Sequence, residues 1–295
     1  MKETKKLENR IEELENRLLQ KDSEIKTFKK ELILLNDQIE DLISKLNNQL
    51  KMAYRLQEKL VPTEFPNIPG FEFSTKFSAS LKAGGDYFDI FEIEDRFRFS
   101  ILLSSCSGYS ISSLFLSVLL KLTSHIETKK GAPPEKVLSM IIKELTSQIT
   151  EQDSANIFYA LINRRNYEMS YCHQGDNLAF LFRSHEKDVI ELKKTGDAIT
   201  KKIKGKTTSE TIGLNPKDCL VVISDGIKQV VNSKGVAFDG EKIKKLILES
   251  GKKNTHEIRN EIFYQLQKWG DTKELNKDVT VLVAEVKDRV LKLAR

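Results

Sequence analysis

The chain has 295 residues and a hydrophobic content of 39%, which suffices for one large domain with an extension or for two domains. Its 48 basic and 43 acidic residues leave a net charge of +5, and this even balance does not indicate a nucleic-acid-binding protein. Cys106, Cys172 and Cys219 form no C-x-x-C pair, so we expect small buried or half-buried thiols in a reducing compartment. No signal peptide is recognisable, and the longest apolar stretch, 114–120, is too short to span a bilayer. We therefore expect a cytoplasmic protein that binds neither nucleic acid nor membrane.

A heptad repeat occupies the first part of the chain. Its alternating four-three spacing runs through Leu7, Ile11, Leu14, Leu18, Lys21, Ile25, Phe28, Leu32, Leu35, Ile39, Leu42, Leu46, Gln49, Ala53, Leu56 and Leu60. Only Lys21 and Gln49 interrupt the apolar series, and no glycine or proline falls within it. A period of 3.5 sustained over this length predicts a left-handed coiled coil. We expect a parallel homodimer through residues 7–60, with an antiparallel or hetero-oligomeric coil as the alternative.

The helix is predicted to end in the sequence VPTEFPNIPG. Pro62, Pro66 and Pro69 cannot continue a helix, and Gly70 closes the segment. The sequence therefore predicts a coiled coil at 1–60, a proline-rich linker at 61–70 and a globular domain at 71–290.

The globular part alternates short β-rich runs with helical stretches. Strands are predicted at FEFSTKF, FDIFEI, FRFSILL, NIFYALI, YEMSYC, LAFLFR, CLVVIS and VTVLVAEV, and helices near 111–127, 135–151, 241–250 and 256–268. Short turns between strands favour antiparallel pairing, and helices need a sheet face to cover. The expected fold class is α+β, a sandwich of two antiparallel sheets flanked by helices.

Several motifs, in order, carry a resemblance to a known family. They are LQEKLVPTEFPNIPGFEFSTKFSASLKAGGDYFDIF, FRFSILLSSCSGYS, SANIFYALI, YCHQGDN, IGLNPKDCLVVISDGIKQVVNSKG and NKDVTVLVAEV. Together they resemble the SpoIIE-like branch of the PPM-type, metal-dependent serine/threonine phosphatases, which includes RsbU-like bacterial regulators of sigma-factor partner switching. The resemblance covers residues 54–287. It implies a bacterial signalling protein whose partners include a phosphorylatable regulatory protein or a related phosphatase.

The resemblance also implies a site in which two Mn²⁺ or Mg²⁺ ions, held by four acids, activate a water molecule. Two of these positions keep their acids, Asp86 after the paired glycines and Asp225 in an Asp-Gly turn. The position that usually bridges both ions is Ser105, and the fourth is Lys277. The glycines of the site turns are Gly84, Gly85, Gly108 and Gly226.

These replacements argue against a two-metal centre, since a lysine brings a cation to a cation site. We therefore expect no cofactor and a pseudophosphatase that acts through protein binding. We further expect Lys277 to neutralise Asp225, and Asp86 as a second partner, unless Lys277 points into solvent. The alternative is an active phosphatase that binds Mn²⁺ or Mg²⁺ through an altered ligand set. Asp278 is the possible substitute ligand if it lies in the loop before its strand. Asp89, otherwise a surface or turn residue, is a weaker substitute.

Two other signals remain. Lysines at 193, 194, 201, 202, 204 and 206 predict a solvated loop, or alternatively an anionic docking patch. His173 and Asp176, in YCHQGDN, are predicted to form a turn.

Overall fold

The computed structural model describes residues 2–60, 62, 64–80, 85–108, 110–128, 131–203, 207–251, 253–270 and 275–287. The chain forms two compact units, Met1–Met52 and Ala53–Arg295.

The N-terminal helix α1 spans Lys2–Leu60 and ends two residues before Pro62, as the prolines predict. Its described heptad leucines, isoleucines and phenylalanine are 46–66% exposed in the single chain. The helix therefore leaves its predicted apolar stripe uncovered. Pairing through this stripe stays a prediction. Within the described residues, no helix combines the length and apolar character needed to cross a membrane.

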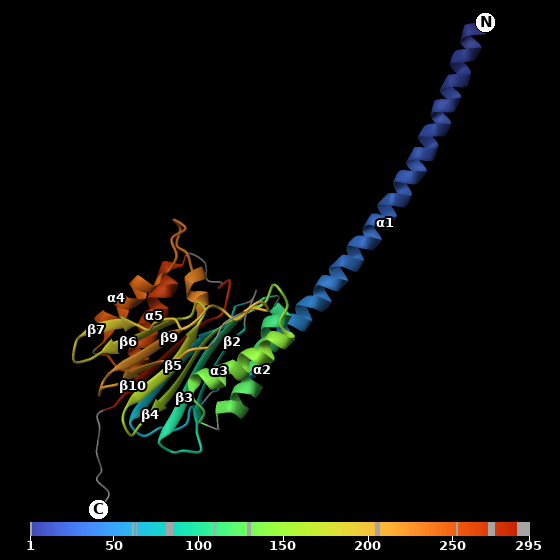
Figure 1. Cartoon of the computed structure of the whole chain (residues 1–295). Coiled ribbons are helices and arrows are strands. Elements are labelled where there is room, and N and C mark those ends of the chain that lie inside the picture. The colour runs from blue at the N-terminus through green and yellow to red at the C-terminus, as the bar shows by residue number, and fades with distance from the viewer. Residues whose placement is uncertain are drawn as a thin grey trace, which may run out of the picture. The chain divides into compact units, whose positions relative to one another are not determined.

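Two five-stranded antiparallel sheets form the centre of the globular unit (Figure 1). The first sheet has the order β1 (Phe71–Ser78), β10 (Val279–Val286), β9 (Cys219–Ile223), β6 (Leu178–Arg183) and β7 (Asp188–Glu191). The second has the order β2 (Asp86–Glu92), β3 (Arg98–Ser107), β4 (Ser154–Asn163), β5 (Glu168–Gln174) and β8 (Glu210–Gly213). The sheets bury one shared apolar layer, to which Phe88, Leu103 and Phe158 contribute from one sheet and Leu181 and Leu282 from the other.

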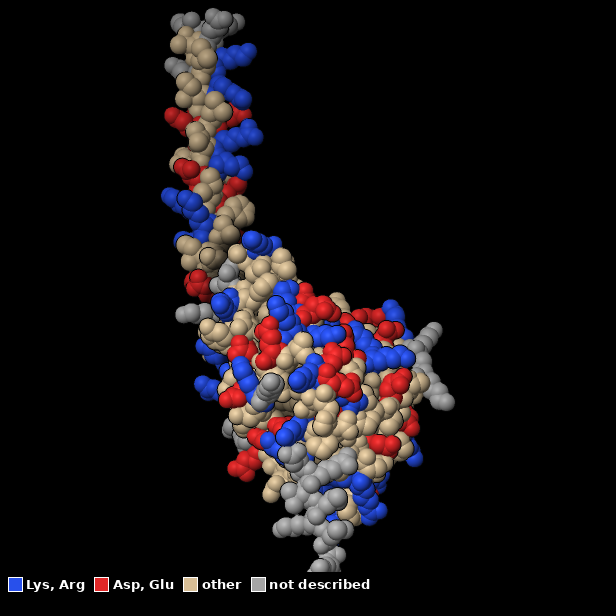
Figure 2. All heavy atoms as spheres, turned by 90° about the vertical axis from the view of Figure 1, so that its left-hand side faces the viewer, with Lys and Arg blue, Asp and Glu red and all other residues tan. Residues whose placement is uncertain are grey.

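Helices cover the outer face of each sheet. Helices α2 (Ser110–Thr128) and α3 (Pro134–Gln148) pack on the second sheet, while α4 (Gly240–Ser250) and α5 (Thr255–Trp269) pack on the first. A short 3₁₀ turn, η1 (Asp225–Gln229), follows β9. Asn254 starts α5 with a capping box, in which its side chain accepts from the Glu257 N–H and Glu257 accepts from the Asn254 N–H. On the face of the globular unit in Figure 2, basic and acidic side chains are interspersed rather than segregated.

The predicted sandwich is confirmed, and each predicted strand and helix has a counterpart in the structure. Strands β7 and β8 were not predicted, because each has four residues and a side-chain pattern too short to show a period. Helix α3 ends at Gln148 instead of residue 151, since the backbone of Ile149 is already extended. The three cysteines are buried and free, as predicted.

Candidate functional site

Four strand ends bring the predicted site residues together at one end of the sandwich. Asp86 begins β2 and pairs with Ser105 near the end of β3. In the other sheet, Ile223 at the end of β9 pairs with Val281 near the start of β10. Because β9 and β10 run antiparallel in this register, the segment after β9 and the segment before β10 lie at the same end of the sheet. Asp225 and Lys277 lie in these two segments.

The Asp225 carboxylate is held by two side chains that stand at predicted ligand positions. Lys277 Nζ donates to Asp225 Oδ2 at 2.5 Å, and Ser105 Oγ donates to Asp225 Oδ1 at 2.6 Å. Lys277 Nζ also donates to Ser107 Oγ at 2.5 Å. The side chains of Lys277 and Asp225 are 5% and 14% exposed, so water screens their charges weakly. We call Asp225, Lys277, Ser105 and Ser107 the lysine corner.

Asp86 and Asp278 form a second group beside the lysine corner. Asp86 Oδ2 accepts from the Thr280 hydroxyl at 2.8 Å, and the buried Asp86 Oδ1 has no hydrogen-bond partner among the described residues. The Asp278 carboxylate accepts from the backbone N–H groups of Ser80, Gly85 and Asp86 at 2.7, 3.0 and 3.3 Å. Its charge is therefore distributed over three peptide donors, which stabilise the ionised form.

Burial raises the pKa of Asp86 to about 8, and the carboxylates of Asp278 and Asp225 nearby add to the rise. Burial away from water disfavours the ionised form of a carboxyl group, and nearby negative charge disfavours it further. The second group consequently combines one carboxyl group that accepts from three backbone donors with one whose burial favours the protonated form.

A close approach at Gly226 holds the two loops of the site together. A Cβ atom at this position would lie 1.9 Å from the carbonyl oxygen of Asp278 and 3.4 Å from Cβ of Lys277. Only a glycine permits this spacing without a backbone shift. Of the other predicted turn glycines, Gly85 donates its N–H to Asp278, and Gly108 follows the end of β3. Gly84 lies outside the described residues.

The structure decides several of the alternatives left by the sequence. The predicted ion pair between Lys277 and Asp225 is present, and the alternative in which Lys277 points into solvent is wrong. Asp86 bonds Thr280 rather than Lys277. Asp278 does lie in the loop directly before β10, where its carboxylate reaches the Asp86 backbone. Lys277 and Asp278, which both precede β10, therefore face the site. Lys277 contacts the carboxylate of Asp225, and Asp278 contacts the backbone of Asp86.

Asp89 does not lie at the site. It stands within β2, three residues after Asp86, so its side chain leaves the opposite face of the strand. There it accepts from the Tyr87 hydroxyl and from the N–H of Ile90, each at 2.8 Å. Of the expectation that Asp89 is a surface or turn residue, the turn is wrong, because the strand runs from Asp86 to Glu92, and the Asp89 side chain is half-buried.

Asp176 lies in a turn after β5, as predicted, whereas the prediction of a turn is wrong for His173, because the strand continues to Gln174. His173 is buried at the end of β5, with its ring nitrogens facing the carbonyl oxygens of Leu192 and Asn177 at 3.3 and 2.9 Å. Burial lowers the pKa of His173. Asp176 is exposed and pairs with Lys194 at 2.7 Å.

The lysine-rich segment that follows is partly solvated. Lys193 and Lys202 pair with exposed Glu210 and Glu151. Lys204 and Lys206 lie outside the described residues.

Three residues at the site, Ser80, Ser107 and Thr280, are not identified as site residues by the sequence. Thr280 is a polar residue within the apolar run of β10, and this break in the run is the feature of the sequence that could have identified it as a site residue. Ser107 belongs to a serine-rich turn in which no single serine stands out. Ser80 contributes its backbone N–H, which no sequence pattern reveals. Among the described residues, no group of three or more histidine, cysteine, aspartate or glutamate side chains is arranged to hold a metal ion.

Residues 95–287, more than half of the chain, match the family described as Stage II sporulation protein E (SpoIIE). The chain belongs to the SpoIIE family. This SpoIIE-family chain has a PP2C-like fold and is similar to the SiaA PP2C domain of Pseudomonas aeruginosa. The TM-score is 0.70 at 16% identity, and the match covers 82% of this chain and 97% of that domain.

Two further solved structures share the fold. The RsbU and RsbW domains of a Mycobacterium tuberculosis protein match with a TM-score of 0.64 at 16% identity, over 77% of this chain and 63% of that one. The PP2C phosphatase domain of SpoIIE from Bacillus subtilis, solved with a fragment of its regulatory domain, gives 0.62 at 18% identity, over 73% and 63%. No curated protein matches the chain. At these identities the structural likeness shows the fold alone.

Proposed function

We propose that this chain is a bacterial signalling protein whose SpoIIE-family domain is a pseudophosphatase and acts by binding other proteins. The observation that carries the proposal is the lysine corner. There an ammonium group lies 2.5 Å from one oxygen of Asp225 while a serine hydroxyl takes the other. Both oxygens of the carboxylate that would ligate a divalent ion are thus engaged by protein donors.

The remaining donors support the same proposal. A pair of divalent ions needs several ionised oxygen ligands around each ion. Asp278 is bound by three backbone N–H groups, and Asp86 is buried with a raised pKa. A divalent ion at this place would also stand close to the Lys277 ammonium, and a divalent and a univalent cation about 4 Å apart repel by about 8 kcal/mol at an effective dielectric of ~20. The residues present do not fit a two-ion centre.

One observation favours the alternative, an active phosphatase with an altered ligand set. Asp278 lies in the loop before β10 and its carboxylate faces Asp86, so the two aspartates share one end of the site. In that arrangement Asp86, Asp225 and Asp278 would be the ligands of Mn²⁺ or Mg²⁺. The alternative requires the ion pair between Lys277 and Asp225 to break. Each charge would then either move into solvent or stay buried without its partner, and a buried unpaired charge is destabilising.

A phosphatase assay separates the two. The full chain would be incubated with a phosphoserine peptide and Mn²⁺ or Mg²⁺, beside its Asp225→Ala variant. The proposal predicts equal phosphate release from both proteins, at the level of the metal-only blank. Release by the native chain that the Asp225→Ala variant loses would establish the enzyme and contradict the proposal.

We further propose that residues 1–60 form a parallel coiled coil that pairs two chains, that 61–70 is a linker, and that 71–290 is the partner-binding domain. The uncovered apolar stripe of α1 supports this proposal, because an exposed series of leucine and isoleucine at heptad spacing is stabilised by a second helix. The free, buried cysteines fit a cytoplasmic location. A phosphorylatable regulatory protein or a related phosphatase is the partner class that the family suggests.

A further inference from the structure

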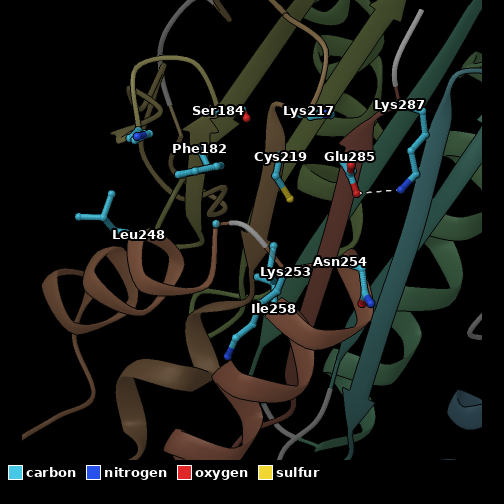
Figure 3. A pocket seen from close by; sticks show the side chains of 12 residues that line it. Phe182, Ser184, Lys217, Cys219, Leu248, Lys253, Asn254, Ile258, Glu285 and Lys287 are labelled. Carbon is cyan, nitrogen blue, oxygen red and sulfur yellow. Dashed lines mark hydrogen bonds and ion pairs between the residues drawn. The ribbon is translucent and has the colours of Figure 1, made fainter. Parts of the chain in front are cut away.

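The pocket shown in Figure 3 does not by itself indicate a ligand. It has a volume of about 500 Å³ and lies between the start of β9, the end of β10 and helices α4 and α5. Lys287, which lines it, pairs with Glu285, the dashed contact in the figure, and also with Glu72. Lys253 pairs with Glu261. The protein itself thus supplies the partners of these lysines, in contrast to the charges along α1.

Charged residues follow the apolar stripe of α1 on both sides in a regular order. With Ile11 at heptad position a and Leu14 at d, position g directly precedes a and position e directly follows d. In the first part of the helix, three successive g positions are Arg10, Arg17 and Glu24. The three e positions that follow them by five residues are Glu15, Asp22 and Lys29. These six residues, which we call the edge residues, are exposed or half-exposed in the single chain, and Figure 2 shows both signs of charge along α1.

The edge residues are complementary to a second copy of the same helix. In a parallel, in-register coiled coil, a residue at g contacts the residue at e that lies five positions later on the other helix, and these contacts set the choice of partner and the orientation. Each pair that this spacing forms here joins opposite charges, and the two-fold symmetry of a dimer forms each pair twice. The pairs are Arg10 with Glu15, Arg17 with Asp22, and Glu24 with Lys29.

Most of the edge residues have no partner within their own helix. Among the described residues, four of the six take part in no ion pair. Arg10 Nη1 lies 2.6 Å from Glu13 Oε2, and an exposed pair of this kind is weak. Glu24 Oε2 lies 2.5 Å from Nζ of Lys21, the lysine that interrupts the apolar stripe at a d position. This contact draws the ammonium group toward the edge of the stripe and accounts for a lysine at d.

An antiparallel pair of helices lacks this complementarity. In such a pair, e faces e and g faces g. With the two helices fully overlapped, Asp22 would face Ile43, and Lys29 would face Asn36. Charges would then lie opposite an apolar side chain and a neutral one. A different protein is not needed as the partner either, because the pattern of edge residues is complementary to itself.

We infer that α1 selects a second copy of this chain, parallel and in register, through the charge pairs of its edge residues. The inference rests on the coiled coil proposed above and adds to it the residues that choose the partner and the orientation. The apolar stripe supplies most of the stability of such a dimer, and the edge residues decide which helix it accepts. Both globular units then follow the same end of the coil, so that the dimer offers two copies of the partner-binding domain.

Charge reversal at two of the pairs tests the inference in the full chain. The g variant carries Arg10→Glu and Arg17→Glu, and the e variant carries Glu15→Lys and Asp22→Lys. Each variant places like charges opposite one another, so analytical ultracentrifugation shows a dimer dissociation constant at least tenfold above that of the native chain. A variant with all four changes has opposite charges at both pairs again and the net charge of the native chain. Its dissociation constant returns toward the native value.

The control variant and a cross-link complete the experiment. Lys26→Glu with Lys30→Glu makes the same change in charge as the g variant at exposed positions outside the stripe, and this variant pairs like the native chain. Leu14→Cys, at a d position, forms a disulfide-linked dimer under mild oxidation, since the native cysteines are buried. Leu19→Cys, exposed and outside the heptad, does not.

The possible failures of the inference and of the proposed function are distinguishable. If the native chain is a dimer but the g and e variants pair as tightly as the control, the inference is wrong and the proposed coiled coil stands. The inference is equally wrong if Leu14→Cys cross-links no more than Leu19→Cys. A monomeric native chain would overturn the inference and the proposed coiled coil together. The phosphatase assay decides the pseudophosphatase proposal separately from all of these results.

Discussion

Replacing Lys277 by methionine tests whether the lysine corner stabilises the fold. Methionine keeps the length and apolar stem of the side chain while it removes the charge. At 2.5 Å and an effective dielectric of ~20, the attraction between Lys277 and Asp225 is about 6–7 kcal/mol before desolvation is subtracted. Removing one partner of a buried pair typically destabilises a protein by about 3–5 kcal/mol. Since Asp225 keeps its Ser105 hydrogen bond and is 14% exposed, we expect about 3 kcal/mol.

The expected change is a fall in melting temperature of about 6–12 °C for a domain of this size. The chain has a single tryptophan, Trp269 in α5, so its fluorescence follows the unfolding of the globular unit separately from α1. The double variant Lys277→Met with Asp225→Asn removes both charges and recovers most of the loss. Lys193→Met, which breaks an exposed pair, changes the melting temperature by less than about 2 °C. A Lys277→Met variant as stable as the native chain would refute the reasoning, as would a double variant no more stable than the single one.

Three further predictions concern other parts of the molecule. Burial lowers the pKa of His173, so the folded state binds this proton less readily than the unfolded state. The stability present above pH ~6.5 is therefore lost as the pH falls below that value, and denaturant titrations from pH 7 to 5 should show a smaller loss for His173→Gln. Gly226→Ala lowers the free energy of unfolding by about 1–3 kcal/mol through its clash with the Asp278 carbonyl, whereas Gly213→Ala, with open space around it, has little effect in the same urea titration. Leu32→Glu, at a heptad position of α1, raises the dimer dissociation constant at least tenfold in analytical ultracentrifugation, whereas Leu34→Glu, equally exposed but outside the heptad, does not. Equal effects at the two leucines would refute the heptad assignment.

The elements that could be predicted from sequence are those with a sustained period. The alternation in FRFSILL and the continuous apolar run of VTVLVAEV identify β3 and β10, because a strand between two packed layers buries both faces. Strand β8 could not be predicted because its four residues are mostly exposed and its place depends on pairing with β5. A sequence pattern carries no information about such a partner.

The site was predictable to the level of residue type and not to the level of backbone contacts. A lysine at one predicted ligand position and an aspartate at another suffice to suggest an ion pair, since an unpaired buried charge is costly. The position of Asp278 could not be decided from its neighbours. Its carboxylate is fixed by the N–H groups of Ser80, Gly85 and Asp86, which belong to segments almost 200 residues away in the chain. Backbone donors are identical at every residue, so only the fold identifies them.

The most direct test of the central proposal is calorimetric titration of Mn²⁺ into the native chain and into a variant with Ser105→Asp and Lys277→Asp. The variant restores both missing acids and removes the competing ammonium group from Asp225. The account predicts no saturable binding by the native chain and clear binding by the variant. Micromolar binding of Mn²⁺ by the native chain, lost on Asp225→Ala, would contradict it.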